Sequence, residues 1–411
     1  MNTQAIIITI GDELLIGQVV DTNSAYMATC LNRYGVEIEE VISVHDEAHQ
    51  IAETVQYAMQ KASIVLLTGG LGPTKDDITK RVLCDYFHTT LVEDSRVRSH
   101  VYDLYKERPE VLNRLTETQW QVPANATIWP NRVGSAPIMV WAESGHCLVS
   151  MPGVPYEMQI AMDEQVVPYI VQSVLPPEQQ QITHRTVLVH GIAESALALR
   201  IEKWESALPA GMHLAYLPKD GLIRLRLSGY GVDSEDVDTQ VHTLLPLISD
   251  YVLATEDKPI EVLVGETLKR NHQTIATAES CTGGRLAAML NAHAGSSAFY
   301  YGSVVAYDNS VKKNVLGVSA GDLEQYGAVS EPVVRQMAEG VRNLLHTDFA
   351  IATSGIAGPD GGTPEKPVGT VWMAWATPQG TFAQCFHLGK LREQVALRAC
   401  NTALVYLLSY M

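Results

Sequence analysis

The feature that most constrains this fold is the alternation of short apolar runs with amphipathic segments near the start of the chain. Strands are predicted where β-branched and aliphatic residues cluster, at 5–10, 36–44 and 63–68. Helical spacing follows the first two runs, at 23–34 and at 46–62, where Asp46 is expected to cap the helix. This order predicts an α/β fold with a doubly wound sheet, whose ligands bind after the carboxyl ends of the strands.

The chain has 411 residues, which is too long for one ordinary domain. Pro176-Pro177, followed by Glu178 and three glutamines (Gln179–Gln181), is typical of a linker. Beyond it the pattern predicts a small module with the order β-α-β-β-α-β, and a second boundary falls near Lys258-Pro259. We therefore expect three domains, at 1–175, 176–256 and 257–411.

The charge balance bears on the partners. With 46 acidic and 29 basic side chains, the formal net charge is −17, which repels a nucleic-acid backbone. The six cysteines form no C-x-x-C pair and fit a reducing compartment. The start of the chain lacks a basic signal-peptide region, and no apolar run reaches the ~18 residues of a membrane helix. We expect a cytoplasmic protein with no membrane partner.

A turn rich in Ser, Thr and Gly marks the last third of the chain. Glu279-Ser280-Cys281-Thr282-Gly283-Gly284 lies between a predicted strand and a predicted helix. Free backbone N–H groups and the helix dipole at such a turn suit a phosphate or an oxyanion. The alternative is an ordinary helix cap with two turn glycines.

A serine and a lysine follow this turn. Ser297 ends a Gly-Ser-Ser sequence, and Lys312 comes five residues after Tyr307. A serine nucleophile needs a base, and a lysine with a lowered pKa can serve, with a tyrosine hydroxyl between the two. The spacing alone does not show that Ser297 and Lys312 meet.

A long irregular segment comes next. Residues 354–369 contain five glycines and three prolines after a predicted buried strand. Such a segment excludes a helix or a strand and lets the backbone approach a ligand. The alternative is a long hairpin connection.

Taken together, residues 258–411 resemble the nicotinamide-nucleotide amidase domain of the competence/damage-inducible CinA family. The resemblance implies hydrolysis of nicotinamide mononucleotide to nicotinic acid mononucleotide and ammonia, with no cofactor. It implies that Ser297 is the nucleophile, that Lys312 is its base and that Tyr307 assists. Ser280 would polarise the reacting group.

The resemblance also implies a set of ligand-binding residues, which comprises Ser280, Thr282, Gly283, Ser354, Gly355 and Arg392. Ser354 stands where the family usually has threonine, and the hydroxyl is kept. The family's Gly-Asp-Arg sequence reads Gly389-Lys390-Leu391-Arg392 here, without the acidic residue. Arg392 remains the expected contact for a phosphate or carboxamide.

Two motifs in the first domain combine glycines with carboxylates. Gly11-Asp12-Glu13 follows the first predicted strand, and a segment from Gly69 to Asp77 follows the third. Glycine N–H groups can bind phosphate, and carboxylates can hold Mg²⁺ against a pyrophosphate. The alternative makes Asp76 and Asp77 helix caps.

These motifs, with Met151-Pro152-Gly153 and the residues to Met158, resemble the molybdopterin-binding-like (MoaB/MogA-type) domain of full-length CinA proteins. The resemblance implies a metal-dependent ADP-ribose pyrophosphatase that yields AMP and ribose 5-phosphate. The metal (Mg, Mn or Co) would be held by Asp12, Glu13, Asp76 and Asp77, and phosphate would contact Gly70 and Gly72. The family also implies a KH-like middle module, without RNA binding, and a homodimer.

Two alternatives stay open. The first domain could bind molybdopterin without turning over ADP-ribose. The whole chain could instead be a non-catalytic nucleotide-sensing or recruitment factor in competence.

Overall fold

A computed structural model describes residues 3–143, 145–176 and 182–411 of the chain. Contacts divide the chain into two compact units, Met1–Thr183 with Gly229–Ser234, and His184–Ser228 with Glu235–Met411. Residues 177–181 of the expected linker lie outside the described residues. None of the described helices is long and apolar enough to cross a membrane.

The first unit is built on a sheet with the strand order β2-β1-β3-β8-β7-β6. Its strands are β1 (Gln4–Ile10), β2 (Glu37–Val44), β3 (Ile64–Thr68), β6 (Thr127–Trp129), β7 (Ile138–Glu143) and β8 (His146–Met151). The strands β2, β1, β3 and β8 run parallel to one another. The strand β7 pairs antiparallel with β8, and β6 pairs antiparallel with β7. The predicted doubly wound sheet is confirmed.

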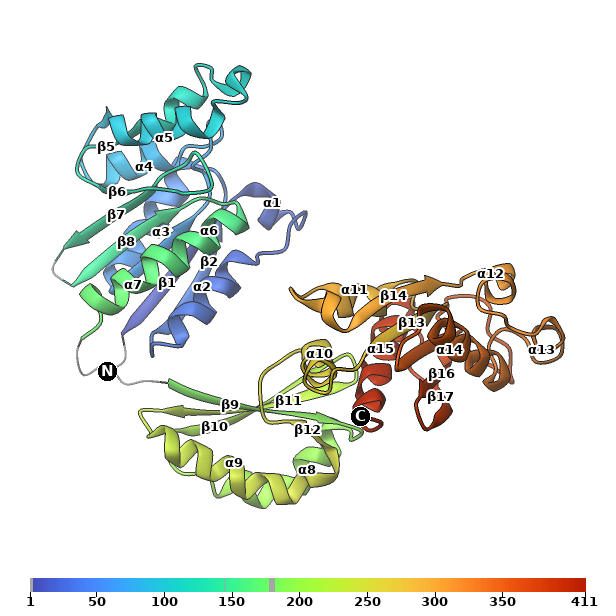
Figure 1. The fold of residues 1–411 in the computed structure, drawn as a ribbon. Coiled ribbons are helices and arrows are strands. Elements are labelled where there is room, and N and C mark those ends of the chain that lie inside the picture. The colour runs from blue at the N-terminus through green and yellow to red at the C-terminus, as the bar shows by residue number, and fades with distance from the viewer. Residues whose placement is uncertain (1–2, 144, 177–181) are drawn as a thin grey trace. The chain divides into compact units, whose positions relative to one another are not determined.

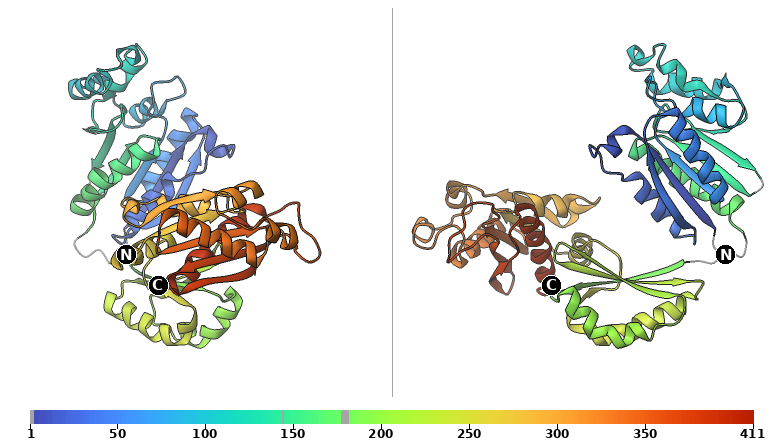
Figure 2. Two further views of the ribbon diagram at one scale, coloured as in Figure 1. Left: turned by 45° about the vertical axis from the view of Figure 1, so that its right-hand side comes forward. Right: turned by 180° about the vertical axis from the view of Figure 1, so that it is seen from behind.

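Helices cover both faces of this sheet (Figures 1 and 2). Alternate residues of β1 point to opposite faces, so Ile7 packs in one core while Ile6 and Ile8 pack in the other. The Ile7 side is covered by α2 (Asn23–Asn32) and by one helical run that includes α6 (Pro155–Ala161) and α7 (Val167–Tyr169). The other side is covered by α3 (Ala48–Lys61) and α4 (Thr79–Tyr86).

A small insertion lies between α4 and β6, at the top of Figure 1. It contains β4 (Leu91–Glu93), α5 (Ser95–Tyr105) and β5 (Gln121–Pro123), and β4 pairs antiparallel with β5. The Asp94 carboxylate caps α5 by accepting from the N–H groups of Arg96 and Val97. Trp120 and Val101 belong to its own small apolar core.

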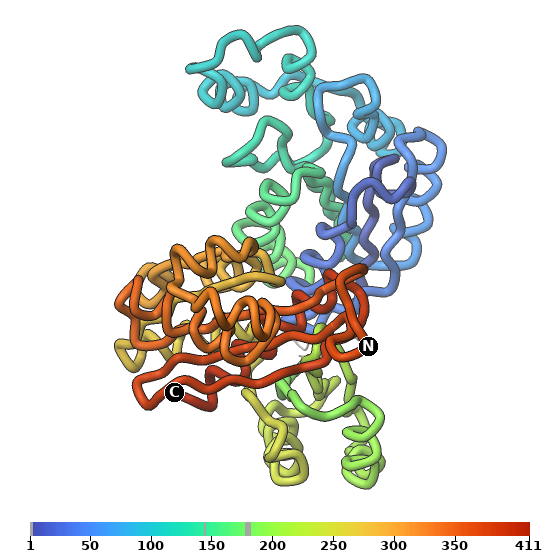
Figure 3. The backbone as a smooth tube through the Cα atoms, turned by 90° about the vertical axis from the view of Figure 1, so that its right-hand side faces the viewer, coloured from blue at the N-terminus to red at the C-terminus, as the bar shows by residue number. Residues whose placement is uncertain are grey.

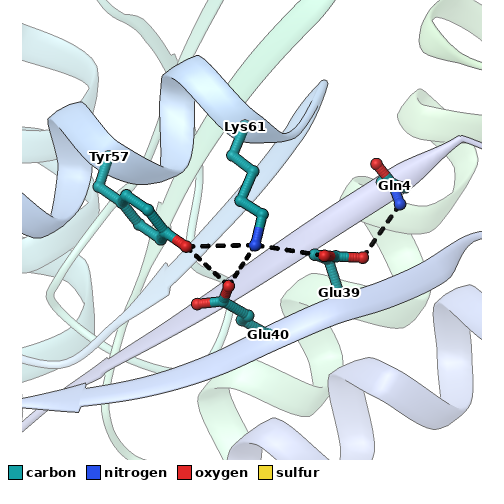
Figure 4. Close-up of polar contacts among 5 residues, drawn as sticks. All are labelled: Gln4, Glu39, Glu40, Tyr57 and Lys61. Atoms are coloured by element: carbon teal, nitrogen blue, oxygen red, sulfur yellow. Dashed lines mark hydrogen bonds and ion pairs between the residues drawn. The ribbon is translucent and has the colours of Figure 1, made fainter.

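Charged side chains cover the edge strand β2 (Figure 4). Lys61, at the end of α3, forms ion pairs with Glu40 and with Glu39, the latter at 3.2 Å. Tyr57 donates to Glu40 at 2.7 Å, and Gln4 donates to Glu39 at 3.0 Å. The Glu40 contact, followed by those with Tyr57 and Glu39, raises the pKa of Lys61. Charges of this kind discourage a further strand from pairing with the edge.

The middle sheet has the order β10-β11-β9-β12. Along the chain the elements are β9 (Ile182–His190), α8 (Glu194–Ser206), β10 (Met212–Lys219), β11 (Leu222–Tyr230), α9 (Ser234–Ile248) and β12 (Val252–Ala254). This is the predicted β-α-β-β-α-β order. Asp220 and Gly221 both have positive φ angles, +49° and +85°, which is the conformation of a tight hairpin turn.

The last sheet has the order β14-β13-β15-β16-β17. Its strands are β13 (Ile275–Glu279), β14 (Tyr300–Val305), β15 (Phe349–Gly355), β16 (Thr370–Thr377) and β17 (Gly380–His387). The strands β14, β13 and β15 are parallel, and β16 and β17 form an antiparallel hairpin, in red in Figure 3.

Two helical layers enclose this sheet. One face packs against α10 (Ile260–Arg270), α11 (Arg285–Asn291) and α15 (Arg392–Leu408). The other face packs against α14 (Glu331–Leu345), which meets the small side chains of Ala276, Ala278, Ala350 and Ala352. The short helices α12 (Asn309–Asn314) and α13 (Ala320–Tyr326) follow β14.

The two large sheets share one topological property. In the first, the chain passes from β1 to its neighbour on one side, β2, and then to its neighbour on the other side, β3. In the last, it passes in the same way from β13 to β14 and then to β15. A ligand crevice is expected at the carboxyl ends where the strand order reverses in this way.

Candidate active sites

Ser280 and Lys312 meet beyond the carboxyl ends of β13 and β14 in the last sheet. Ser280 follows β13, and Lys312 lies on α12, which follows β14. The Lys312 Nζ is 3.2 Å from the Ser280 Oγ and donates to the carbonyl oxygens of Ala306 and Tyr307, at 2.7 and 3.0 Å. The lysine is 1% exposed. Three acceptors therefore surround the amine, one for each proton of an ammonium group.

The surroundings act on the protonation of Lys312 in both directions, and the net effect is a lowered pKa. Burial lowers the pKa of Lys312, while the nearby Asp308 carboxylate opposes the shift. A neutral amine can keep two N–H bonds to the Ala306 and Tyr307 carbonyls and accept the Ser280 proton with its lone pair. The pair can thus convert the serine hydroxyl into a nucleophile.

The structure shows no hydrogen bond between Ser297 and Lys312 among the described residues, and Lys312 contacts a different serine. Ser297 is exposed in a short turn that comes before β14, whereas Ser280 follows the end of β13. Because β13 and β14 are parallel, these positions lie at opposite ends of the two strands. Five strand residues separate them, which corresponds to roughly 16 Å. The serine that contacts Lys312 is Ser280.

The Glu279 side chain holds the turn that carries Ser280. Glu279 is fully buried, and its Oε2 accepts from the Thr282 hydroxyl at 2.7 Å and from the N–H groups of Gly284 and Leu286 at 3.0 and 3.1 Å. Its Oε1 accepts from the N–H of Ala287 at 2.7 Å. One carboxylate thus binds the otherwise unpaired N–H groups at the start of α11.

An exposed pair lies near the dyad. Tyr307, 63% exposed, receives a hydrogen bond from the Arg392 guanidinium at 3.4 Å, and Arg392 also donates to the Gly358 carbonyl at 2.9 Å. The Tyr307 carbonyl is the group that holds Lys312. Arg392 keeps further N–H groups for a ligand, because a guanidinium has five donors.

Three of the predicted ligand-binding groups are used inside the protein. The Thr282 hydroxyl is buried between Glu279 and Thr353. The buried Ser354 hydroxyl donates to the Ala328 carbonyl at 2.7 Å. The Gly283 N–H donates to the Ser280 carbonyl at 3.2 Å.

The fourth, Gly355, is a packing position. A Cβ at Gly355 would come within 2.7 Å of Val371 Cγ2 and 2.8 Å of the Thr370 carbonyl oxygen. The residue must therefore be small for β15 to pair with β16 at this point.

Glu279→Gln tests the role of the buried carboxylate. The amide keeps one oxygen and turns an N–H₂ group toward backbone N–H donors, so we expect a loss of about 2–3 kcal/mol in the free energy of unfolding. Urea denaturation measures this change. The matched control is Glu324→Gln on the exposed side of α13, which should change stability by less than about 0.5 kcal/mol. Equal stability of the two variants would contradict the assigned role.

A cavity of about 450 Å³ lies at the reversal point of the first sheet. The segments after β1, β2, β3 and β8 all contribute to its lining, including Gly11, Asp46, Gly70 and Gly153. Residues from four strand ends thus converge as the strand order predicts.

The glycine-rich segment after β3 needs its glycines. Gly70 has a φ of +65°, and a Cβ there would lie 2.1 Å from the Thr79 Oγ1. The Asp77 carboxylate accepts from the N–H groups of Gly72 and Thr74, at 2.7 and 2.9 Å. Asp77 therefore shapes the segment, and the Gly72 N–H that was expected to contact phosphate is bonded to it. The helix α4 begins at Thr79, so neither Asp76 nor Asp77 is its cap.

The remaining carboxylates differ in their contacts. Glu13, Asp46 and Asp76 line the cavity, whereas Asp12 bonds to His45 Nδ1 at 2.8 Å and does not line it. The hydrogen bond with His45 is the main reason that the pKa of Asp12 is lowered. Burial raises the pKa of Asp46, and the carboxylates of Asp12, Glu13 and Asp76 add to this effect. Asp46 caps no helix, because α3 begins at Ala48.

Asn23 lines the same cavity and has an unpaired acceptor. Its Nδ2 donates to the Gly153 carbonyl at 2.8 Å and to the Thr68 Oγ1 at 3.2 Å. Thr68 Oγ1 itself donates to the Pro152 carbonyl at 2.8 Å, so the orientation of the amide is fixed. The Oδ1 atom of Asn23, a residue 8% exposed, is buried with no hydrogen-bond partner in the described structure. A ligand hydroxyl or amine can satisfy it.

The carboxylates of this cavity suit a divalent cation that is shared with a substrate. No group of three or more His, Cys, Asp or Glu side chains within the described ranges is placed to hold a metal ion by itself. Mg²⁺ is usually held by one or two carboxylates together with substrate phosphates. The neighbouring carboxylates repel the negative charge of Asp46, and a cation bound here would offset this repulsion. Its candidate ligands are Glu13, Asp46 and Asp76.

Several contributors were missed in the sequence. The helical spacing places Asn23 and Asp46 at helix starts, and the sequence motif places Glu279 in a turn without indicating its role. The signal for Asp46 was available, since it follows the end of β2 at the edge where Gly11 and Gly69 also lie. The orphaned Asn23 oxygen has no sequence signal, because it depends on the Thr68 hydroxyl and the Gly153 carbonyl.

Comparisons with known proteins cover both ends of the chain. The model of the CinA C-terminal domain matches residues 257–411. The model of a probable molybdopterin binding domain matches residues 6–172. A solved structure, competence damage-inducible protein A from Klebsiella pneumoniae, is 41% identical and covers 36% of this chain and 92% of its own, with a TM-score of 0.35.

Curated relatives match over nearly the full length. A CinA-like protein from Flavobacterium psychrophilum is 42% identical and covers 98% of this chain and 97% of its own. A CinA-like protein from Cytophaga hutchinsonii is 44% identical, with coverage of 96% and 95%. With both domain models matched in the same chain, the protein belongs to the CinA family.

Proposed function

We propose that the last domain is a hydrolase that deamidates nicotinamide mononucleotide to nicotinic acid mononucleotide and ammonia. The observation that supports this most directly is the 3.2 Å contact between Ser280 Oγ and the buried Lys312 Nζ. A serine with a buried lysine base suits acyl transfer from an amide. Membership of the CinA family supports the choice of substrate.

The proposed reaction has two stages. Lys312, as a neutral amine, takes the Ser280 proton while the Oγ attacks the carboxamide carbon. The tetrahedral intermediate collapses, the C–N bond breaks, and the leaving nitrogen takes the proton from Lys312 and departs as ammonia. A water molecule then gives a proton to Lys312 and attacks the acyl-serine, and Lys312 returns this proton to the leaving Ser280 Oγ as the carboxylic acid is released. The N–H groups of Ser280, Gly283 and Gly284 are bonded inside the protein, so the proposed oxyanion donors are the N–H groups of Cys281 and Thr282 in the same turn.

The exposed pair formed by Tyr307 and Arg392 is the proposed anchor for the nucleotide. Arg392 is held by the Gly358 carbonyl and by Tyr307, and it retains donors for the ligand phosphate. The Tyr307 side chain is thus assigned to ligand binding, while its carbonyl helps to hold the base.

Ser280→Ala and Ser297→Ala distinguish the two candidate nucleophiles. We expect Ser280→Ala to reduce ammonia release from nicotinamide mononucleotide by about 10⁴-fold or more, because no hydroxyl remains beside Lys312. Ser297→Ala should keep activity within about threefold of the wild type. A coupled ammonia assay measures both variants, and circular dichroism confirms that they fold. Loss of activity in Ser297→Ala alone would overturn the assignment of Ser280.

The pH profile tests the neutral lysine. Burial favours the uncharged amine, so its pKa falls and the base becomes active at a lower pH than a free lysine would. We expect kcat/KM to rise with pH as Lys312 loses its proton and then to level off. Lys312→Arg stays protonated and should lower the rate by about 10³-fold and remove this rise. A rate that falls over the same pH range would contradict the mechanism.

For the first domain we propose a metal-dependent pyrophosphatase that acts on ADP-ribose and yields AMP and ribose 5-phosphate. The observation that favours it is the cavity at the reversal point, which combines glycines, carboxylates and the unpaired Asn23 oxygen. When bound, Mg²⁺, Mn²⁺ or Co²⁺ would neutralise the charge of the pyrophosphate. Glu13, Asp46 and Asp76 would hold the cation, and Asn23 Oδ1 would accept from a ribose hydroxyl.

AMP formation from ADP-ribose tests this second activity. We expect turnover with a divalent cation and none after chelation. Asp76→Asn should reduce turnover by about 10²-fold, because it removes a carboxylate that lines the cavity. High-performance liquid chromatography of AMP measures the rate. Binding of molybdopterin with no AMP formation would instead support a binding role, and full activity without metal would contradict the proposal.

The homodimer and the cytoplasmic location are parts of the same proposal, supported by the family resemblance. The competing recruitment role predicts that neither substrate is turned over.

A further inference from the structure

A second cavity adjoins the acidic one in the first domain. It has a volume of about 440 Å³, and Gly72, Thr74 and Asp77 line both cavities. Its other charged residues are all basic, namely Lys75, Lys80 and Arg81. Its one carboxylate, Asp77, already accepts from the N–H groups of Gly72 and Thr74. A cationic cavity therefore shares part of its lining with an anionic one.

Lys80 is the buried charge of the second cavity. It lies on α4, is 6% exposed, and its Nζ donates to the Thr118 carbonyl at 2.6 Å. This is the single hydrogen bond of the Nζ among the described residues, and an ammonium group has three protons to donate. Burial lowers the pKa of Lys80 to about 8, so the protonated form still predominates at pH 7. A buried cation with two free donors is costly unless a ligand anion pairs with it.

The two neighbours of Lys80 add charge without being buried. Lys75 and Arg81 are exposed and belong to opposite ends of the 75–81 segment. An exposed lysine and arginine at the mouth attract an anion, and Arg81 can bind phosphate in a bidentate manner.

We propose that the cavity around Lys80 is a phosphate subsite that binds without metal and holds one phosphate of a phosphoanhydride substrate. The other phosphate would lie in the acidic cavity, where a cation is needed to bind it. After cleavage the subsite retains the phosphomonoester product. The inference rests on the proposed function for the identity of the phosphoanhydride, whereas phosphate binding itself requires no turnover.

Isothermal titration calorimetry of the full chain tests the subsite in buffer with EDTA at pH 7. The probe is inorganic phosphate, and the Arg392→Gln background removes the proposed anchor of the other domain. We expect binding that is weakened about tenfold or more by Lys80→Met and about threefold by Arg81→Gln. Arg81 is exposed, so its variant tests the subsite even if Lys80→Met does not fold.

Two control variants show whether the phosphate binds in the cavity around Lys80. Lys106→Met removes an exposed lysine of the same domain and should leave phosphate binding unchanged. Asp76→Asn removes a carboxylate of the acidic cavity only and should leave metal-free binding unchanged or tighter. No phosphate binding, or equal binding by the wild type, Lys80→Met and Arg81→Gln, would overturn the proposal.

Two product probes identify the half of the substrate that the subsite holds. AMP and ribose 5-phosphate are titrated separately under the same conditions, and the proposal requires that Lys80→Met weaken at least one of them. Failure of the pyrophosphatase proposal gives a different result, namely no AMP from ADP-ribose with metal while phosphate binding stays dependent on Lys80.

Discussion

The constraint on which both candidate sites depend is that parallel strands end at one edge of a sheet. Where the strand order reverses, the segments after two neighbouring strands diverge and leave a crevice. β1 and β3 form such a point in the first sheet, and β13 and β15 form one in the last. The hydrophobic cores fix these strands from both faces. The positions of the functional side chains are therefore set first by strand pairing and then by the contacts of these side chains with one another.

The two crevices differ in how their surroundings affect charged groups. In the first domain, carboxylates face a cavity and repel one another, so a positive partner is favoured there. In the last domain, one lysine is buried among main-chain carbonyls, and burial favours its neutral form. The net charge of −17 describes neither environment. The chemistry of each site follows from local burial and from a few oriented dipoles.

Much of the fold could be predicted from the sequence, because the apolar runs and the helical spacing record which faces are buried. The α/β class and the doubly wound sheet are confirmed, and the middle module has the β-α-β-β-α-β order that the pattern predicts. The serine that contacts Lys312 was harder to predict. Ser297 and Ser280 both precede Lys312 in turns next to a strand, and the parallel pairing of β13 with β14 places the two turns at opposite ends of these strands. Contacts with backbone carbonyls, such as those of Lys312 and Asn23, leave no residue pattern to read.

The way in which Lys312 is held has an evolutionary consequence. Its amine is fixed by the carbonyls of residues 306 and 307, and every amino acid supplies a carbonyl. The side chains at 307 and 392 can therefore change without removing the carbonyl groups that hold the Lys312 amine. Under the proposed mechanism, residue 307 contacts the ligand through its side chain and holds the base through its carbonyl. Substitutions at this position would then change the ligand and leave the base in place.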